Sequence, residues 1–145
     1  VQTAGTLTGI SGSTDLIKVG LVRKIVSRGI SIGEIGVTGK ARIIKNNLDM
    51  SLICPGEILF VPEELMKNIP LSKNIAGIVT NQNVNDVYAL FNKNNKKIST
   101  ICNLENMDNH QISNGDLITL QLNEGVIYMG QIEDDDDAID KYKYV

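Results

Sequence analysis

The sequence is poor in the residues that build metal centres. Its 145 residues include one histidine and two cysteines, Cys54 and Cys102. The cysteines lie far apart, with no Cys-x-x-Cys spacing, so they do not form a zinc motif and we expect no metal site. Both have apolar neighbours in the sequence, which predicts buried free thiols in a reducing compartment.

Strong charge and long apolar runs are also absent. The formal net charge is -3, which argues against binding to nucleic acid or to an anionic membrane through broad electrostatics. The sequence contains no 18-residue apolar run and no signal-type segment, so we expect a cytoplasmic protein, with organellar targeting of a longer parent protein left open. The chain begins at Val1 rather than at a methionine, as a piece of a longer protein would.

What is present suffices for one domain. Hydrophobic residues make up 42% of the chain, and a chain of this size can bury roughly 68–70% of its unfolded surface. Apolar and alternating segments predict strands at residues 37–44, 58–61, 76–80, 99–102, 117–122 and 126–129, and helices at 62–68 and 86–93. We therefore expect an α/β domain in which strands dominate and helices cover one flank.

The remaining segments divide the chain. Residues 1–22 combine a Gly/Ser/Thr-rich loop with a strand-like segment, which predicts a hairpin without its partner strands. Glycines at 29, 33 and 36 interrupt residues 23–36, which indicates a joint made of a short strand, a crossing and a turn. Residues 132–145 open with a run of acids that repel one another, so we expect a solvated tail rather than a calcium site.

One junction is a candidate site. Residues 77–91 run from a buried strand, through a turn rich in asparagine, into the first turns of a helix. A helix N-terminus offers unpaired N–H groups and the positive end of a dipole. Such a junction is therefore suited to a phosphate site or a nucleophile.

Five ordered segments resemble the swivelling phosphohistidine domain of enzymes that use phosphoenolpyruvate. They are GKAR at 39–42, PGEIL at 55–59, AGIVT at 76–80, NGDLIT at 114–119 and EGVIYMG at 124–130. Residues 3–19 resemble the closing hairpin and effector loop of the pyruvate kinase C-terminal domain. Together the two matches imply the C-terminal part of a pyruvate kinase, in which 23–36 joins the hairpin at 1–22 to an extra β/β/α swivelling domain at 37–131.

The resemblance places the family's phosphocarrier histidine at Tyr88. The family's Thr-Ser-His-Ala segment corresponds to Asp86, Val87, Tyr88 and Ala89. A phenol of pKa about 10 is mostly protonated, and its phosphate ester is too stable to pass the group on. Asp86 also puts negative charge where the phosphate would arrive. The resemblance therefore implies a phosphohistidine site that has lost its chemistry.

A structural role replaces the lost one. We expect Asp86 to be the N-cap of the helix, and Val87, Leu90 and Phe91 to form one apolar stripe against the sheet. For Tyr88 we expect a packing or surface role. His110 lies in a loop far from this junction and is expected to be a solvated histidine rather than a displaced phosphocarrier.

The first loop is a second candidate site. Glycine-freed N–H groups and hydroxyls can hold a sugar phosphate. The residues are Gly9, Ser11, Gly12, Ser13 and Thr14. The family's pocket also uses an upstream loop outside this chain, so this fragment alone is not expected to bind an effector. Two interpretations stay open for the loop: effector binding in the parent enzyme, and a flexible surface hairpin loop.

The leading hypothesis is a non-catalytic C-terminal extension of a pyruvate kinase with a structural, assembly or regulatory role. The resemblance implies an upstream barrel that converts phosphoenolpyruvate and ADP to pyruvate and ATP with Mg²⁺ and K⁺, in a homotetramer. Its partners are the parent's own upstream domains, and the chain alone should be inactive. Two alternatives remain: the phosphotransfer domain of a pyruvate phosphate dikinase or phosphoenolpyruvate synthase, and a stand-alone binding module.

Overall fold

The computed structural model describes residues 24–105, 107 and 111–130. The expected hairpin at 1–22 with its effector-type loop, His110 and the tail at 132–145 lie outside the described residues. Apart from Lys24, the described residues belong to one compact unit, Ile25–Gln131. This unit begins twelve residues before the boundary at Val37 that the sequence suggested.

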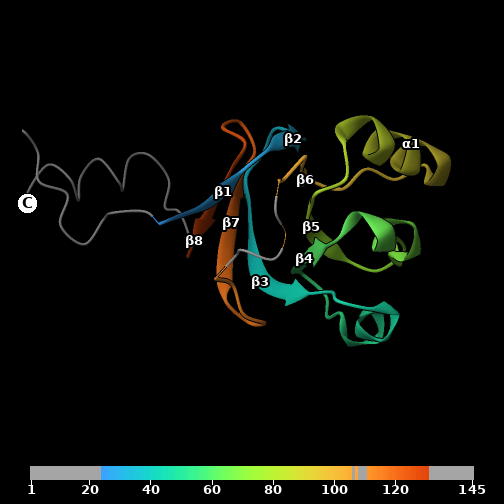
Figure 1. The fold of residues 1–145 in the computed structure, drawn as a ribbon, viewed down its shortest axis with the longest axis horizontal. Coiled ribbons are helices and arrows are strands. Elements are labelled where there is room, and N and C mark those ends of the chain that lie inside the picture. Colours follow the sequence, from blue (N-terminus) through green and yellow to red (C-terminus); the bar gives the residue numbers. More distant parts are fainter. Residues whose placement is uncertain (1–23, 106, 108–110, 131–145) are drawn as a thin grey trace, which may run out of the picture. The chain divides into compact units, whose positions relative to one another are not determined.

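Strands dominate the unit, as expected (Figure 1). The strands are β1 (Ile25–Arg28), β2 (Ile30–Ile32), β3 (Val37–Ile43), β4 (Glu57–Val61), β5 (Ile75–Thr80), β6 (Thr100–Cys102), β7 (Leu117–Gln121) and β8 (Val126–Met129). The helices are the 3₁₀ helices η1 (Asn47–Leu52) and η2 (Glu63–Asn68) and the α-helix α1 (Val84–Asn94). None of the described helices is long and apolar enough to cross a membrane.

The sheet closes on itself. Its strand order is β1-β8-β7-β3-β4-β5-β6-β2, and the two outermost strands in this order are separated in the chain only by Gly29. The strands β3, β4, β5 and β6 run parallel, whereas β7, β8, β1 and β2 pair antiparallel. The stretch expected to be a joint thus supplies two strands of the sheet.

Gly29 allows this closure. A Cβ atom at this position would collide with the carbonyl oxygen of Cys102, and the Gly29 amide donates to the Gly125 carbonyl at 2.9 Å. Only a residue without a side chain can pass so close to both strands. The glycine that suggested a break between units is therefore required inside one.

Two apolar clusters give the unit three layers. On β4, Ile58 and Phe60 point to one face, and Leu59 and Val61 point to the other, because side chains alternate along a strand. The first pair packs with residues of β7 and β8, including Ile118 and Ile127. The second pair packs under η2 and α1. In Figure 1 the helices accordingly lie on one side of β4 and β5, with β7 and β8 on the other.

Three local expectations need correction. Pro62 is the N-cap of η2, not its first residue. Helix η1 was not expected; a reciprocal cap between Asn46 and Asp49 stabilises its start. Cys54 is exposed, because it lies in the turn before β4, whereas Cys102 on β6 is buried.

Candidate functional site

Helix α1 begins at Val84, two residues earlier than expected, and Asn83 is its N-cap. The side-chain oxygen of Asn83 accepts from the Asp86 amide at 2.9 Å, and its NH₂ group donates to the Asp86 carboxylate at 2.9 Å. Asp86 is therefore the third helical residue and not the N-cap. Its carboxylate still lies at the positive end of the helix dipole, where it is stabilising.

A second asparagine closes the same end. The side-chain oxygen of Asn103 accepts from the Val84 amide at 2.9 Å. Asn103 follows β6 in the left-handed conformation, with φ at 63°, and its own amide donates to the Gln82 carbonyl at 2.9 Å. Two amides of the first turn are thus already bonded to the chain's own side chains, which leaves an incoming phosphate fewer donors.

Asn103 was missed by the sequence analysis. It comes directly after the buried segment that ends at Cys102, and an asparagine leaving a strand is a turn signal. Which helix it would cap could not be inferred, since it contacts the β5–α1 turn only after β5 and β6 pair.

The predicted site residues separate in space. Val87 is fully buried and belongs to the core with Phe91, and Leu90 packs against them, so the expected apolar stripe is confirmed. Tyr88 is 40% exposed and lines a shallow groove with Asn92 and residues that follow the helix. Asp86 is bonded to Asn83. The structure therefore gives Tyr88 a surface position beside the last turns of α1.

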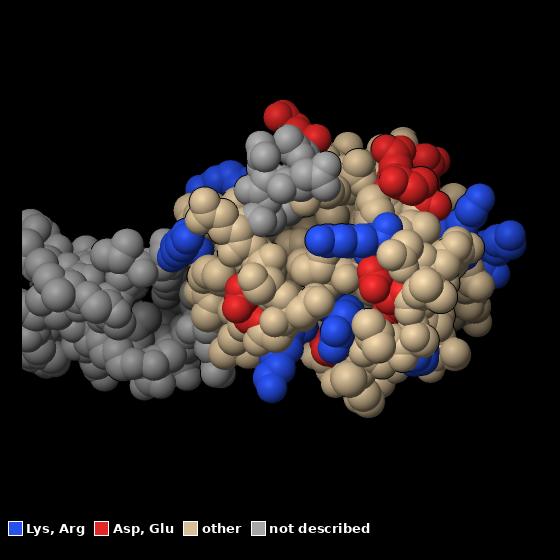
Figure 2. Space-filling model, turned by 60° about the horizontal axis from the view of Figure 1, so that its bottom comes forward, with Lys and Arg blue, Asp and Glu red and all other residues tan. Residues whose placement is uncertain are grey.

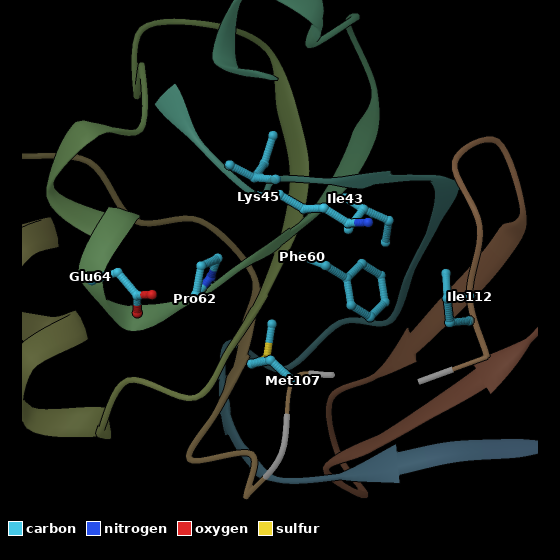
Figure 3. Close-up of a pocket in the computed structure, with 8 residues that line it drawn as sticks. Ile43, Lys45, Phe60, Pro62, Glu64, Met107 and Ile112 are labelled. Atoms are coloured by element: carbon cyan, nitrogen blue, oxygen red, sulfur yellow. The ribbon is translucent and has the colours of Figure 1, made fainter. Parts of the chain in front are cut away.

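A cleft opens at the carboxyl ends of β3 and β4 (Figure 3). Its volume is about 460 Å³. It is lined by Ile43, Ile44, Lys45, Phe60, Pro62, Glu64, Met107 and Ile112. Four separate chain segments contribute these residues, so no local motif could have indicated the cleft.

Glu57 and Arg42 form a partly buried ion pair at the start of β4. The guanidinium donates to both carboxylate oxygens, at 3.1 and 2.9 Å, and the Cys54 amide donates to one of them at 2.8 Å. Burial alone would raise the pKa of Glu57, but the hydrogen bonds and charge of Arg42 leave that pKa lowered. The Glu57 hydrogen bond raises the pKa of Arg42. The pair is a structural clamp between β3 and β4.

The buried cysteine is not a nucleophile. Burial raises the pKa of the Cys102 thiol to about 11, and its sulfur donates to the Ile30 carbonyl at 3.1 Å. At neutral pH it is a thiol rather than the reactive thiolate. Across the described ranges, no group of three His, Cys, Asp or Glu side chains could hold a metal ion.

The surface carries mixed charge. On the face drawn in Figure 2, lysines and arginines are interspersed with aspartates and glutamates among neutral side chains. An interspersed pattern of this kind produces no strong field of one sign over that face.

Curated relatives of the chain are pyruvate kinases. It is 33% identical over 132 residues to pyruvate kinase 2 of Synechocystis sp., and 29% identical over 132 residues to pyruvate kinase of Staphylococcus saprophyticus. These alignments cover 91% and 90% of this chain but 22% of each relative. The chain thus spans about a fifth of their length.

Other comparisons add little. No protein-family model matches. Among solved structures, MccF in complex with glutamyl sulfamoyl guanosine is 14% identical, with a TM-score of 0.46, over 70% of this chain and 41% of that one. This likeness is too weak to support an argument about fold or function. The sequence relatives alone place the chain: it is similar to one part of bacterial pyruvate kinases.

Proposed function

We propose that the chain is a non-catalytic C-terminal extension of a pyruvate kinase, formed by a degenerate swivelling phosphohistidine-like domain. The observation that carries this proposal is the closed N-terminus of α1. Asn83 and Asn103 each accept from one amide of its first turn, Asp86 adds a negative charge, and Tyr88 lies on the surface. The pyruvate kinase relatives support the identity of the parent enzyme. The bonded amides at the start of α1 support the proposal that this part is non-catalytic.

The layered architecture supports the fold assignment. A closed sheet packs helices on one face of its parallel strands and antiparallel strands on the other, which is a β/β/α arrangement. Helices η1, η2 and α1 follow β3, β4 and β5 in turn. Parallel strands need such crossovers.

The whole enzyme's properties follow from the same proposal. The parent converts phosphoenolpyruvate and ADP to pyruvate and ATP in an upstream barrel, and it is a cytoplasmic homotetramer. We assign Mg²⁺ and K⁺ to that barrel, as the resemblance to pyruvate kinases implies. A sugar-phosphate effector would use the loop at residues 9–14 together with upstream residues.

Exposed leucines support an assembly role. Leu48 and Leu52 on η1 are 81% and 54% exposed. Large apolar side chains grouped on a surface often mark an interaction site. About four-fifths of each relative lies outside the aligned part, and we propose that this remainder covers η1.

Truncation of the full-length protein after Arg23 tests the proposed function. A domain that docks only in the folded enzyme adds its interface free energy to stability. We expect a lower melting temperature or a shifted oligomer distribution, with kcat changed by less than about tenfold. Loss of several orders of magnitude in kcat, with the tetramer and its melting temperature intact, would show that the extension takes part in catalysis.

Point variants locate the docking surface. Leu48→Gln with Leu52→Gln in the full-length protein should reproduce part of the truncation's effect on melting temperature. Leu117→Gln is the matched control, since Leu117 is 42% exposed but lies on β7, away from η1. An equal effect from the control would remove η1 as the interface.

A further inference from the structure

We propose that the cleft at the carboxyl ends of β3 and β4 binds a monocarboxylate that carries an apolar group, with the carboxylate on Lys45. The volume of about 460 Å³ falls within the roughly 300–1,000 Å³ of small-molecule sites. The proposal does not depend on the proposed function, because binding is a property of this chain alone.

One side of the cleft is an apolar wall. Phe60 is 3% exposed and belongs to the core, and Ile43, Met107 and Ile112 pack against the same cluster. All four side chains line the cleft. Removing the apolar part of a ligand from water against such a wall contributes most of the binding free energy of a small molecule.

The charge beside this wall is positive. In Figure 3 the Lys45 side chain runs toward Ile43, and its nitrogen is drawn over the Phe60 ring. The Glu64 carboxylate lies at the opposite end of the cleft, beyond Pro62. A ligand whose apolar group packs on the wall therefore has its polar end beside an ammonium rather than beside a carboxylate.

The Lys45 ammonium is available to a ligand. Lys45 is exposed, and the single ion pair among the described residues joins Arg42 and Glu57. The carboxylate of Asp49 accepts instead from the backbone amide of Lys45, at 2.7 Å. The ammonium therefore has no ionic partner in the described part of the chain.

The three consecutive cleft residues 43–45 offer a ligand no backbone donor. The Ile43 amide donates to the Asn114 side-chain oxygen at 2.6 Å, and the amides of Ile44 and Lys45 are bonded within the chain as well. A phosphate is usually held by several convergent donors, whereas one ammonium can pair with a carboxylate. Glu64, at the far end, would repel a second negative charge. The cleft therefore favours a ligand with a single carboxylate.

The test is a titration of the 145-residue chain with 3-phenylpropionate, followed by NMR of the protein's methyl groups. We expect saturable shifts at the methyls of Ile43, Met107 and Ile112, with a dissociation constant of about millimolar or tighter. 3-Phenyl-1-propanol has the same apolar group with a hydroxyl in place of the carboxylate. It should bind about threefold more weakly, since it forms no ion pair with Lys45.

Charge variants assign the contact. Lys45→Gln should weaken the binding of 3-phenylpropionate about threefold and leave that of 3-phenyl-1-propanol unchanged. Glu64→Gln should leave the affinity for 3-phenylpropionate unchanged or raise it, because Glu64 lies at the other end of the cleft. The matched control is Lys67→Gln, since Lys67 is an exposed lysine of η2 that does not line the cleft. The control should change neither affinity.

Three results would overturn the proposal. The first is the absence of saturable shifts at Ile43, Met107 and Ile112 up to the solubility of 3-phenylpropionate. The second is equal affinity for 3-phenylpropionate and 3-phenyl-1-propanol, which would leave an unselective apolar cleft. The third is full affinity for 3-phenylpropionate in the Lys45→Gln variant. Retained chemical-shift dispersion outside the cleft verifies that each variant is folded.

Discussion

The parallel strands end in two different ways. At β5 the chain passes into α1, and the helix N-terminus is bonded by Asn83 and Asn103. At β3 and β4 the strands end in an apolar cleft that Lys45 and Glu64 border. The first place has the architecture of an anion site in which two of the first-turn amides are already bonded. The second has no recognisable motif but remains open.

The difference shows that a helix N-terminus binds an anion only where its amides are not already bonded by the protein. A helix N-terminus binds an anion through unpaired amides, so a capping side chain competes with the ligand for the same donors. Each cap is worth about 1 kcal/mol, which the chain gains as stability. The sequence pattern predicted a strand followed by a helix here, which β5 and α1 confirm, and the hydrogen bonds decide what this junction can do.

The largest expected effect compares neighbours on α1. Phe91 is 2% exposed and Tyr88 is 40% exposed. Phe91→Ala should lower the free energy of unfolding by about 3–5 kcal/mol, the usual cost of such a core cavity. Tyr88→Ala should cost less than about 1 kcal/mol. Urea unfolding of both variants checks this, and a larger loss for Tyr88→Ala would contradict its surface position.

The next effect concerns the amino end of β4. Arg42→Ala leaves the Glu57 carboxylate without its ionic partner. The side chains of Arg42 and Glu57 are 19% and 9% exposed. We expect a loss of about 2 kcal/mol, below the full cost for a completely buried pair. Urea unfolding at neutral pH measures it. A loss no greater than that of an exposed-lysine variant such as Lys93→Ala would mean that solvent screens the pair.

The same pair predicts a pH dependence. The pKa of Glu57 is lowered in the folded state, against burial, by Arg42 and the Cys54 amide. Its contribution is therefore complete above the unfolded pKa of about 4.3 and is lost as the pH falls through the lower folded value. Glu57→Gln should flatten that part of the stability curve between pH 5 and the acid limit. An unchanged curve would assign the acid sensitivity to other carboxylates.

A smaller effect tests the closure of α1 directly. Asn83→Ala and Asn103→Ala should each lower the free energy of unfolding by about 1 kcal/mol, because each leaves an amide of the first turn without its acceptor. Asn92→Ala is the control, since Asn92 is exposed in the helix interior and caps nothing at the N-terminus. If the control cost as much as the caps, the loss would reflect helix propensity rather than capping.

The sequence predicted the strands whose positions follow from the local pattern of apolar and polar residues. The strands near 37–44, 58–61, 76–80 and 117–122 are present because apolar residues either fill them or alternate with polar ones along them. The closure through Gly29 was not predictable, since it depends on pairing with β6 and β8, about seventy and a hundred residues later. Asn103 as a cap and the cleft were missed for the same reason. Each is created by segments that meet only in the folded chain.

The most direct test of the central claim is phosphoryl transfer. The full-length protein is incubated with labelled phosphoenolpyruvate, or with labelled ATP, and residues 24–145 are then analysed by peptide mapping. The account predicts no covalent label in this part, because Tyr88 is a surface phenol and the amides of Val84 and Asp86 are already bonded. Stoichiometric, acid-labile label on His110, or stable label on Tyr88, would contradict it.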